Sequence, residues 1–375
     1  MITENEDLQI NHPYPERQTL PSSLLNIYQA DFAYAHGQPV GSGKIKSQAA
    51  DFRVDEVLGY ELSHQGEHLY LDLRKQNLTT DEVVSTLAKA AGVPAKLVSY
   101  SGLKDKLAVT RQWFSIHLPG QADPDWSMLK VPGDGSQLDA SIEIIKQIRH
   151  DKKLRRGVHQ ANNFVIRINA LDADRDDFDA RLQIIKEKGV PNYFGPQRFG
   201  YGGQNLLHGE RILKGTERCR SRHKKGLYFS AVRSLLFNHV LSRRVKDASW
   251  DQYKEGDVLM LDGSHSVFVA RGDEPGLDER VMCQSLHPTG PLWGEKGLRP
   301  ESESGIFEQQ SLAALAEVCT ALEKNGLAYQ RRSLRLKVSD LSWKHLNRQA
   351  VELSFSLPAG CFATVVLREI VKLVD

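Results

Sequence analysis

The segment SGLKDKLAVT, residues 101–110, places one carboxylate between two lysines in a loop that opens with a glycine. The loop lies between an expected helix that ends near Gly92 and an expected strand that starts near Gln112. Asp105 would then project from the edge of a sheet, where the cations of Lys104 and Lys106 favour a carboxylate over a carboxylic acid. Such a group can act as a nucleophile or as a base. A charged triplet in a turn is also common as a solvated surface feature, so the residues alone leave both interpretations open.

Three further motifs resemble known signatures but lack features that those signatures require. The string from His64 to His68 matches the H-x-x-E-H pattern of some zinc proteases, which needs a helix to place both histidines on one face. Gly66 interrupts the string and an alternating strand follows it, so we expect a turn there and no metal site. The glycine-rich segments 40–47 and 199–205 each miss a required position of the nucleotide-binding loops. We therefore expect no metal and no cofactor.

Capping residues and periodicity predict the elements that surround Asp105. Thr79 stands three residues before Glu82, as in a capping box, and apolar residues at helical spacing continue to Gly92. A second helix is expected to begin among Asp174, Asp176 and Asp177 and to end at Gly189. Alternating side chains predict strands at residues 69–73, 112–118, 163–168 and 351–357. The elements interleave without regular βαβ units, which predicts an α+β fold with a mixed, largely antiparallel sheet.

The texture of the sequence changes between about residues 190 and 326. Glycine, proline and basic residues cluster there around helical stretches such as 228–245 and 312–324. We expect this segment to form a second domain. Residues 1–25 contain three prolines and no periodicity, and we expect them to be a flexible N-terminal extension.

Composition limits the class of protein. The 375 residues exceed one typical domain, and 40% hydrophobic with 26% charged residues suits a folded chain. No apolar run reaches the roughly 18 residues of a transmembrane helix, and the first residues are polar and acidic, unlike a secretory signal. The four cysteines lack the spacing of a zinc or redox site. We expect no membrane association and a cytoplasmic location.

The net charge of +2 conceals an uneven distribution of basic residues. They concentrate in residues 146–156, in residues 211–225, and at Arg331, Arg332, Arg335 and Lys337. Such runs are often only solvated faces, but several of them in a nearly neutral chain predict one basic side that could meet nucleic acid.

The segment around Asp105, continued as SGLKDKLAVTRQWFSI, closely resembles the G-x-K-D signature of the tRNA pseudouridine synthase D family. Ser101 stands where such proteins often have Ala. Six more blocks resemble that family in the same order, from about Lys44 to Glu369. They are ADFRVDE at 50–56, GEH at 66–68, HDKKLRRGVHQANNF at 150–164, NYFGPQRFG at 192–200, HPTGPLWG at 287–294 and LPAGCFATVVLRE at 357–369.

The resemblance implies an enzyme that isomerises uridine to pseudouridine, the bacterial type acting on uridine thirteen of certain tRNAs. It implies a circularly permuted pseudouridine synthase fold in which residues 26–190 and 327–375 form the catalytic domain and residues 191–326 form a family-specific inserted α/β domain. No cofactor is implied. The expected partner is tRNA, no protein partner is required, and we expect a monomer.

The resemblance also implies roles for individual residues. Asp105 would be the catalytic carboxylate, with Lys46 as its basic partner and Lys104 as the alternative by adjacency. Asp105 could attack ribose C1′, add to the uracil ring or remove the 2′ proton, and the sequence leaves these routes open.

A base inside a folded tRNA must be flipped out and held between apolar side chains with hydrogen bonds to its polar edge. The resemblance implies that Phe52, Phe164 and Phe362 form this pocket, with Asn162 as the polar contact. Contacts to RNA phosphates are expected from the stretches 146–156 and 211–225. In the first stretch we expect them from Lys152, Lys153, Arg155 and Arg156.

Two other classes of function remain open at this point. One is a non-catalytic RNA-binding or chaperone protein on the same fold, in which the basic side binds RNA and Asp105 is inert. The other is a metal hydrolase built on His64, Glu67 and His68.

Overall fold

The computed structural model describes residues 23–129, 131, 139–272 and 274–374. Within these ranges ten strands form one large sheet. They are β1 (Gly41–Lys44), β2 (Phe52–Val57), β3 (His68–Gln76), β4 (Val98–Tyr100), β5 (Val109–His117), β6 (Ser141–His150), β7 (Ala161–Ala173), β14 (Ser339–Asn347), β15 (Ala350–Pro358) and β16 (Lys372–Leu373).

The main path of this sheet is β14-β15-β7-β2-β5-β3-β6, with β4 paired to β5 and β1 paired to both β7 and β16. Among the described strands of this sheet, β2–β5 and β1–β16 are parallel pairs and the others are antiparallel. The expected α+β fold with a mixed, largely antiparallel sheet is confirmed. Strands from both ends of the chain lie side by side in it.

A smaller sheet, ordered β10-β9-β11-β12, is built from the middle of the chain. Its strands are β9 (Val258–Leu261), β10 (Val267–Val269), β11 (Leu286–Leu292) and β12 (Gln330–Ser333). The chain leaves the large sheet through β8 (Val190–Pro191) and returns through β13 (Arg335–Leu336), and these two strands pair with each other. The two crossings are therefore hydrogen-bonded together.

Helices cover both sheets. The α-helices are α1 (Ser23–Gln29), α2 (Thr80–Ala90), α3 (Arg175–Lys188), α4 (Gln204–Leu213), α5 (Arg222–Lys246), α6 (Leu277–Met282), α7 (Ser302–Leu312), α8 (Ala316–Lys324) and α9 (Ala363–Arg368). Short 3₁₀ turns are η1 (Ala49–Asp51), η2 (Ala95–Leu97), η3 (Trp126–Met128), η4 (Pro196–Phe199), η5 (Tyr201–Gly203) and η6 (Ala313–Leu315). No helix in the described ranges is long and apolar enough to cross a membrane.

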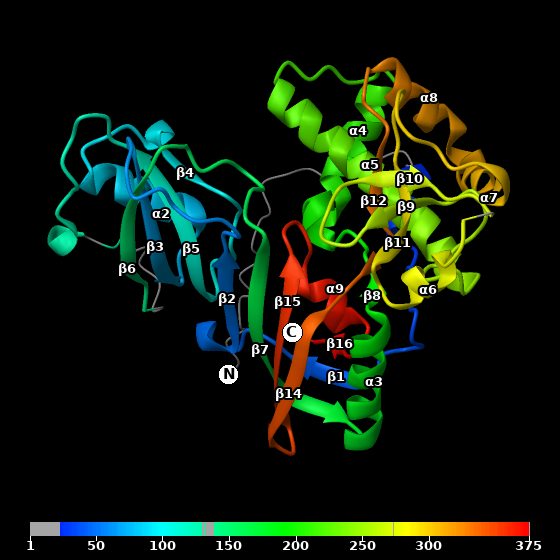
Figure 1. The fold of residues 1–375 in the computed structure, drawn as a ribbon, viewed down its shortest axis with the longest axis horizontal. Coiled ribbons are helices and arrows are strands. Elements are labelled where there is room, and N and C mark those ends of the chain that lie inside the picture. The colour runs from blue at the N-terminus through cyan, green and yellow to red at the C-terminus, as the bar shows by residue number, and fades with distance from the viewer. Residues whose placement is uncertain (1–22, 130, 132–138, 273, 375) are drawn as a thin grey trace, which may run out of the picture.

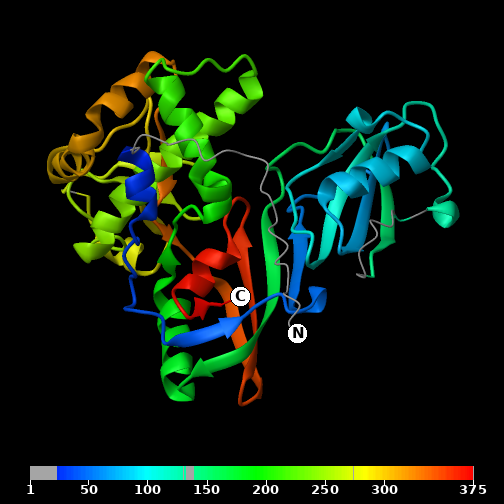
Figure 2. The same ribbon diagram turned by 180° about the vertical axis from the view of Figure 1, so that it is seen from behind.

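The figures show how these layers are arranged. In Figure 1, α2 covers the half of the large sheet that contains β3 and β5, whereas α3 lies beside β14. The smaller sheet and helices α4, α5, α7 and α8 gather at the other end of the molecule. Figure 2 shows α9 in front of β15, at the side where the two groups of elements meet.

Local sequence explains the helices nearest the candidate site. The Thr79 side chain accepts a hydrogen bond from the Glu82 N–H and Glu82 bonds back, which is the expected capping box of α2. Asp174 caps α3 with its side chain, and Gly189 ends it with φ of 75°, a left-handed conformation that glycine adopts without strain. Both helices were predicted from the sequence, and both hold strands of the large sheet in place.

Some expectations differ from the structure in detail. Residues 1–22 lie outside the described part, but the last three residues of the expected extension begin α1, where Leu24 is fully buried. The single helix expected at 312–324 is interrupted, because α7 ends at Leu312 and the turn η6 separates it from α8. Residues 327–333 were expected with the catalytic domain, whereas β12 pairs with β11 in the smaller sheet.

Candidate active site

Asp105 lies in the loop between β4 and β5, and this loop crosses one face of β2. At its start, the carbonyl of Ser101 accepts a hydrogen bond from the Gly157 N–H at 2.8 Å. In its middle, Lys104 reaches Glu56 of β2, and immediately after it β5 pairs in parallel with β2. These contacts fix the loop, and with it Asp105, above the sheet.

The face of the sheet below the loop carries the residues expected to bind the base. Alternate residues of β2 are buried, so Phe52, Val54 and Glu56 share one face. The antiparallel register places Asn162 of β7 opposite Glu56 and Phe164 opposite Val54. Directly opposed residues lie on the same face of a sheet. The structure therefore brings Phe52, Asn162 and Phe164 to the face that the loop crosses.

The carboxylate of Asp105 is paired with Lys46. Its Oδ2 accepts a hydrogen bond from Lys46 Nζ at 2.6 Å, with the side chains 51% and 25% exposed. The ammonium group also lies 4.3 Å from the centroid of the Phe52 ring, within cation–π range. Lys46 has φ of 58°, a left-handed conformation that is uncommon outside glycine and clusters at functional sites. The acid is thus fixed in orientation and still open to a substrate.

A second lysine, which the sequence did not point to, holds the same loop from below. Lys75 is fully buried, and its Nζ donates to the main-chain oxygens of Asp105 at 2.8 Å and Leu78 at 2.6 Å. Burial lowers the pKa of Lys75 to about 8, while the charge of Asp105 opposes that shift. Lys75 continues the two-residue spacing of the buried leucines of β3. That periodicity was the available indication that this lysine points inward.

Lys104 is not the partner of Asp105. Its Nζ lies 2.6 Å from Glu56 Oε2, and the two side chains are 6% and 0% exposed. Burial raises the pKa of Glu56, and the positive charge of Lys104 opposes that shift. The alternative partner expected from adjacency therefore serves a different carboxylate, because the loop directs side chains of consecutive residues to different sides. The buried pair anchors the loop to β2.

His159, between β6 and β7, contacts the start of the Asp105 loop and orients Asn162. The Nδ1 atom of His159 lies 2.6 Å from Ser101 Oγ, and its Nε2 atom lies 3.2 Å from Asn162 Nδ2. Burial, together with the charge of Lys104, lowers the pKa of His159 to about 4, so the ring is neutral near pH 7 and can accept a hydrogen bond from the amide. The Oδ1 atom of Asn162 is then left buried without a partner among the described residues.

The three candidate aromatic residues occupy different environments. Phe52 and Phe164 are buried and meet edge to face with ring centroids 6.2 Å apart. Phe362 is partly buried at the start of α9. The N–H of Ala359 donates to the Gln160 carbonyl at 3.1 Å, which brings the segment leading to Phe362 to the start of β7. Phe52 and Phe164 therefore also serve as core residues, and Phe362 is the most accessible of the three.

The basic residues expected to meet RNA lie in the loop between β6 and β7. Lys152, Lys153 and Arg155 are exposed, and none has an ion-pair partner in the part of the chain that the structure describes. Arg156 differs, because its guanidinium group stacks 4.2 Å above the Tyr100 ring and donates a hydrogen bond to the Tyr100 hydroxyl. Three of the four side chains are free to contact a phosphate.

The other two basic clusters have opposite outcomes. The segment 211–225 joins α4 to α5, and most of its basic side chains are exposed. The cluster at residues 331–337 does not form a basic face, contrary to expectation. Arg331 is in a buried ion pair with Glu308, and the buried Arg335 donates to the main-chain oxygens of Val281 and Leu286.

The H-x-x-E-H string from His64 to His68 does not form a helix. In the described ranges, no group of three His, Cys, Asp or Glu side chains could hold a metal ion. His64 precedes the strand, and His68 begins β3 with its ring 4.7 Å from that of His117. The H-x-x-E-H string is therefore a turn into a strand, as expected.

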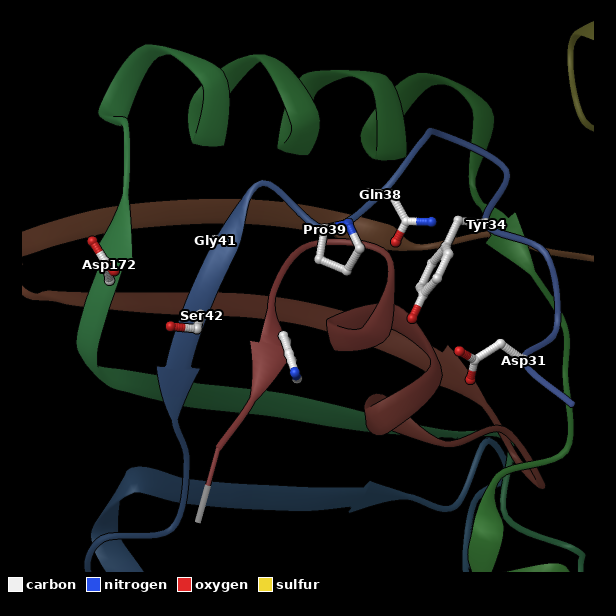
Figure 3. A pocket seen from close by; sticks show the side chains of 8 residues that line it. Asp31, Tyr34, Gln38, Pro39, Gly41, Ser42 and Asp172 are labelled. Atoms are coloured by element: carbon white, nitrogen blue, oxygen red, sulfur yellow. The ribbon is translucent and has the colours of Figure 1, made fainter. Parts of the chain in front are cut away.

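An open hollow of about 520 Å³ lies elsewhere, beside β1 and β16 (Figure 3). Its lining comprises Asp31, Tyr34, Gln38, Pro39, Gly41, Ser42, Asp172 and Lys372. None of the candidate site residues lines it, so we do not assign the site to this hollow.

Comparison with known proteins gives one consistent result. The family model described as tRNA pseudouridine synthase D (TruD) matches residues 31–218 and 218–370. The tRNA pseudouridine synthase D of Pseudomonas putida strain W619 is 46% identical over 345 residues, which cover 91% of this chain and 94% of that protein. The protein of that name from Stutzerimonas stutzeri strain A1501 is 46% identical over 339 residues, covering 90% and 95%.

The fold is also similar to a solved structure. A crystal structure from Methanosarcina mazei, which bears the name tRNA pseudouridine synthase D, aligns with a TM-score of 0.67. The alignment covers 90% of this chain and 95% of that chain at 21% sequence identity. At that identity the solved structure shows similarity of fold, whereas the two relatives at 46% identity show the family.

Proposed function

Since the chain belongs to the tRNA pseudouridine synthase D family, we propose that it isomerises uridine to pseudouridine in tRNA, at uridine thirteen, with Asp105 as the essential catalyst. The observation that carries this proposal is the geometry of Asp105. Its carboxylate is half exposed, held 2.6 Å from Lys46 Nζ, above a face that also carries Phe52 and Asn162.

The reaction breaks the bond between ribose C1′ and uracil N1 and forms a bond between C1′ and C5. C5 loses a proton and N1 gains one, so there is no net oxidation and no group donor is needed. An ionised Asp105 can attack C1′, add to the ring or remove the 2′ proton, and each route needs the carboxylate. Lys46 orients that group, while Lys75 and Lys104 hold the loop that carries it.

We assign the contact with the uracil edge to Asn162. Its Oδ1 atom is a buried acceptor without a partner among the described residues, and such an orphan group is costly unless a ligand satisfies it. The N3–H of uracil is a donor of the right type. The flipped base would stack near Phe52, Phe164 and Phe362, which contribute apolar surface at this face.

The basic loop between β6 and β7 and the segment 211–225 would bind phosphates of the tRNA. Lys152, Lys153 and Arg155 are exposed and without ion-pair partners in the described chain, which supports this assignment. Arg156 would contribute less, because it is already stacked on Tyr100. Such contacts position the RNA without reading its sequence.

The proposal extends to the organisation of the molecule. Residues 26–190 and 327–375 would form the catalytic domain and residues 191–326 the inserted domain. We put the return crossing a few residues later, near Ser333, and the pairing of β12 with β11 in the smaller sheet supports this choice. We expect the enzyme to act as a monomer in the cytoplasm without a protein partner.

The test is to incubate the full chain with unmodified tRNA and map pseudouridine at nucleotide resolution, with and without EDTA. The proposed enzyme forms pseudouridine at position thirteen equally well in both samples. An RNA-binding protein without catalysis would give no product. Loss of product in EDTA would instead favour the metal-dependent class.

A further inference from the structure

Two arginines from distant parts of the chain meet at the junction of the large and small sheets. Arg198 lies in η4, just after the chain leaves the large sheet, and Arg332 lies in β12, just before it returns. Their guanidinium carbons lie 5.2 Å and 4.1 Å from the centroid of the same ring, Phe194. Two like charges are thus held against one ring, one from each of the segments that leave and re-enter the large sheet.

Neither guanidinium group is neutralised. Among the described residues, no carboxylate lies within ion-pair distance of Arg198 or Arg332. The buried Nε atom of Arg198 has no hydrogen-bond partner there, while Arg332 donates to Asn192 Oδ1 at 2.6 Å and, more weakly, to the Asn192 carbonyl at 3.4 Å. Burial lowers the pKa of both arginines; at Arg332 the neighbouring Cys361 opposes that shift and the charge of Arg198 adds to it. Two partly buried cations without a counter-charge are unfavourable unless an anion binds between them.

Other polar groups converge on the same place. Thr364 Oγ1 is buried and has no partner in the part of the chain described. It faces the backbone of Gly195, where an added Cβ atom would lie 3.5 Å away. Cys361 Sγ lies 3.7 Å from the same Asn192 Oδ1 atom that Arg332 contacts. Thr364 and Cys361 stand on either side of Phe362 in the sequence, so this cluster adjoins the segment expected to hold the flipped base.

We propose that Arg198, Arg332 and Thr364 bind one phosphodiester group of the RNA, adjacent to the nucleotide that is isomerised. The inference rests on the proposed function for the identity of the ligand. The planar guanidinium fork binds phosphate oxygens with paired, charge-assisted hydrogen bonds, and a hydroxyl can add a third donor. Because the two arginines come from the two crossings of the chain, the bound phosphate would link the two crossings.

The test uses a short RNA hairpin containing the target uridine, with a single uncharged methylphosphonate placed in turn at each phosphate near it. Binding is measured for the wild type, Arg198→Gln, Arg198→Lys and Thr364→Val. At one position the methylphosphonate should weaken RNA binding by the wild type about tenfold, and the same substitution should not weaken binding by Arg198→Gln any further. The slope of log affinity against log salt should become shallower by roughly 0.7 to 0.9 in Arg198→Gln and return in Arg198→Lys.

Arg175→Gln is the matched control, because Arg175 is exposed at the start of α3, beyond the opposite end of β7 from Ala161. It should behave as the wild type at every position. The Arg198 side chain donates no hydrogen bond within the described residues and its charge is uncompensated, so the unfolding temperature of Arg198→Gln should not fall below that of the wild type, which excludes misfolding.

Equal losses in wild type and Arg198→Gln at all positions would overturn the inference. A second result would also overturn it: inorganic phosphate stabilises the wild type but not Arg198→Gln against heat, and no methylphosphonate position is coupled to Arg198. The site would then bind a free anion and not the RNA. Either result leaves pseudouridine formation by the wild type intact, so a failure here is distinct from a failure of the proposed function.

Discussion

Two lysines contact Asp105, one at its carboxylate and one at its main-chain oxygen. Lys46 neutralises the carboxylate from the open side, and Lys75 holds the main-chain oxygen from inside the protein. The sequence indicated the first through resemblance to a family and missed the second. The spacing of β3 indicates that Lys75 points inward, but it does not reveal what the ammonium group binds, because both acceptors are main-chain oxygens that any sequence provides.

His159 gives a prediction at the same scale. Its folded pKa of about 4 lies below the usual value near 6.5, so between these values the unfolded chain binds a proton that the folded protein does not. The free energy of unfolding should therefore fall as pH decreases through that window. The variant His159→Asn can keep the hydrogen bond to Ser101. Between pH 7 and pH 5 its free energy of unfolding should fall by on the order of 2 kcal/mol less than that of the wild type.

Urea unfolding at the two pH values measures this difference. Other histidines whose pKa burial lowers, such as His36 and His287, titrate in both proteins and cancel in the comparison. Identical losses in the two proteins would show that His159 is not held neutral by the fold.

At the scale of elements, the loop between β4 and β5 depends on a buried ion pair. Removing Lys104 with Lys104→Met leaves the buried Glu56 without its counter-charge, which should lower the free energy of unfolding by about 3 to 5 kcal/mol. The double variant Lys104→Met with Glu56→Gln removes both charges and should recover much of that loss. Denaturant unfolding of the single and double variants measures the coupling.

The exposed pair between Arg74 of β3 and Glu143 of β6 is the matched control. Because water screens it, Arg74→Met should change the free energy of unfolding by less than about 1 kcal/mol. If the double variant at Lys104 and Glu56 were no more stable than the single one, the pair would not be the anchor of the loop.

The elements themselves were the most predictable feature of the chain. The caps of α2 and α3 and the alternation in β3 and β15 are local, so residue patterns revealed them. The pairing of β2 with β7 is not local, because Glu56 lies opposite Asn162. Neither strand encodes its partner, and the two-residue period fits any neighbour equally well. The face that joins Phe52, Asn162 and Phe164 could therefore be expected only from resemblance.

On the scale of the whole molecule, the distribution of charge should govern RNA binding. Replacing Lys152, Lys153 and Arg155 together by Ala should make the slope of log affinity against log salt shallower by roughly 0.7 to 0.9 for each phosphate that the variant no longer binds. Arg156 is left in place because it packs on Tyr100. Filter binding of tRNA across a series of salt concentrations measures the slope.

A control of equal charge replaces Arg175, Lys344 and Arg348, which are exposed on α3 and on or beside β14, away from the loop that carries Asp105. This variant should keep the wild-type slope. Equal changes in both triple variants would mean that total charge acts and not a particular surface. The cluster at residues 331–337 shows why a linear run of charge is weak evidence, since burial removes Arg331 and Arg335 from the surface.

The most direct test of the central claim is pseudouridine formation by Asp105→Asn. Asn has nearly the same shape but no charge and is a poor nucleophile and base, so turnover should fall by at least about 100-fold, whichever of the three routes operates. The pair with Lys46 is half exposed, so thermal stability and tRNA binding should stay close to wild type. A folded Asp105→Asn protein that retains more than about one per cent of wild-type turnover would contradict the catalytic role of this carboxylate.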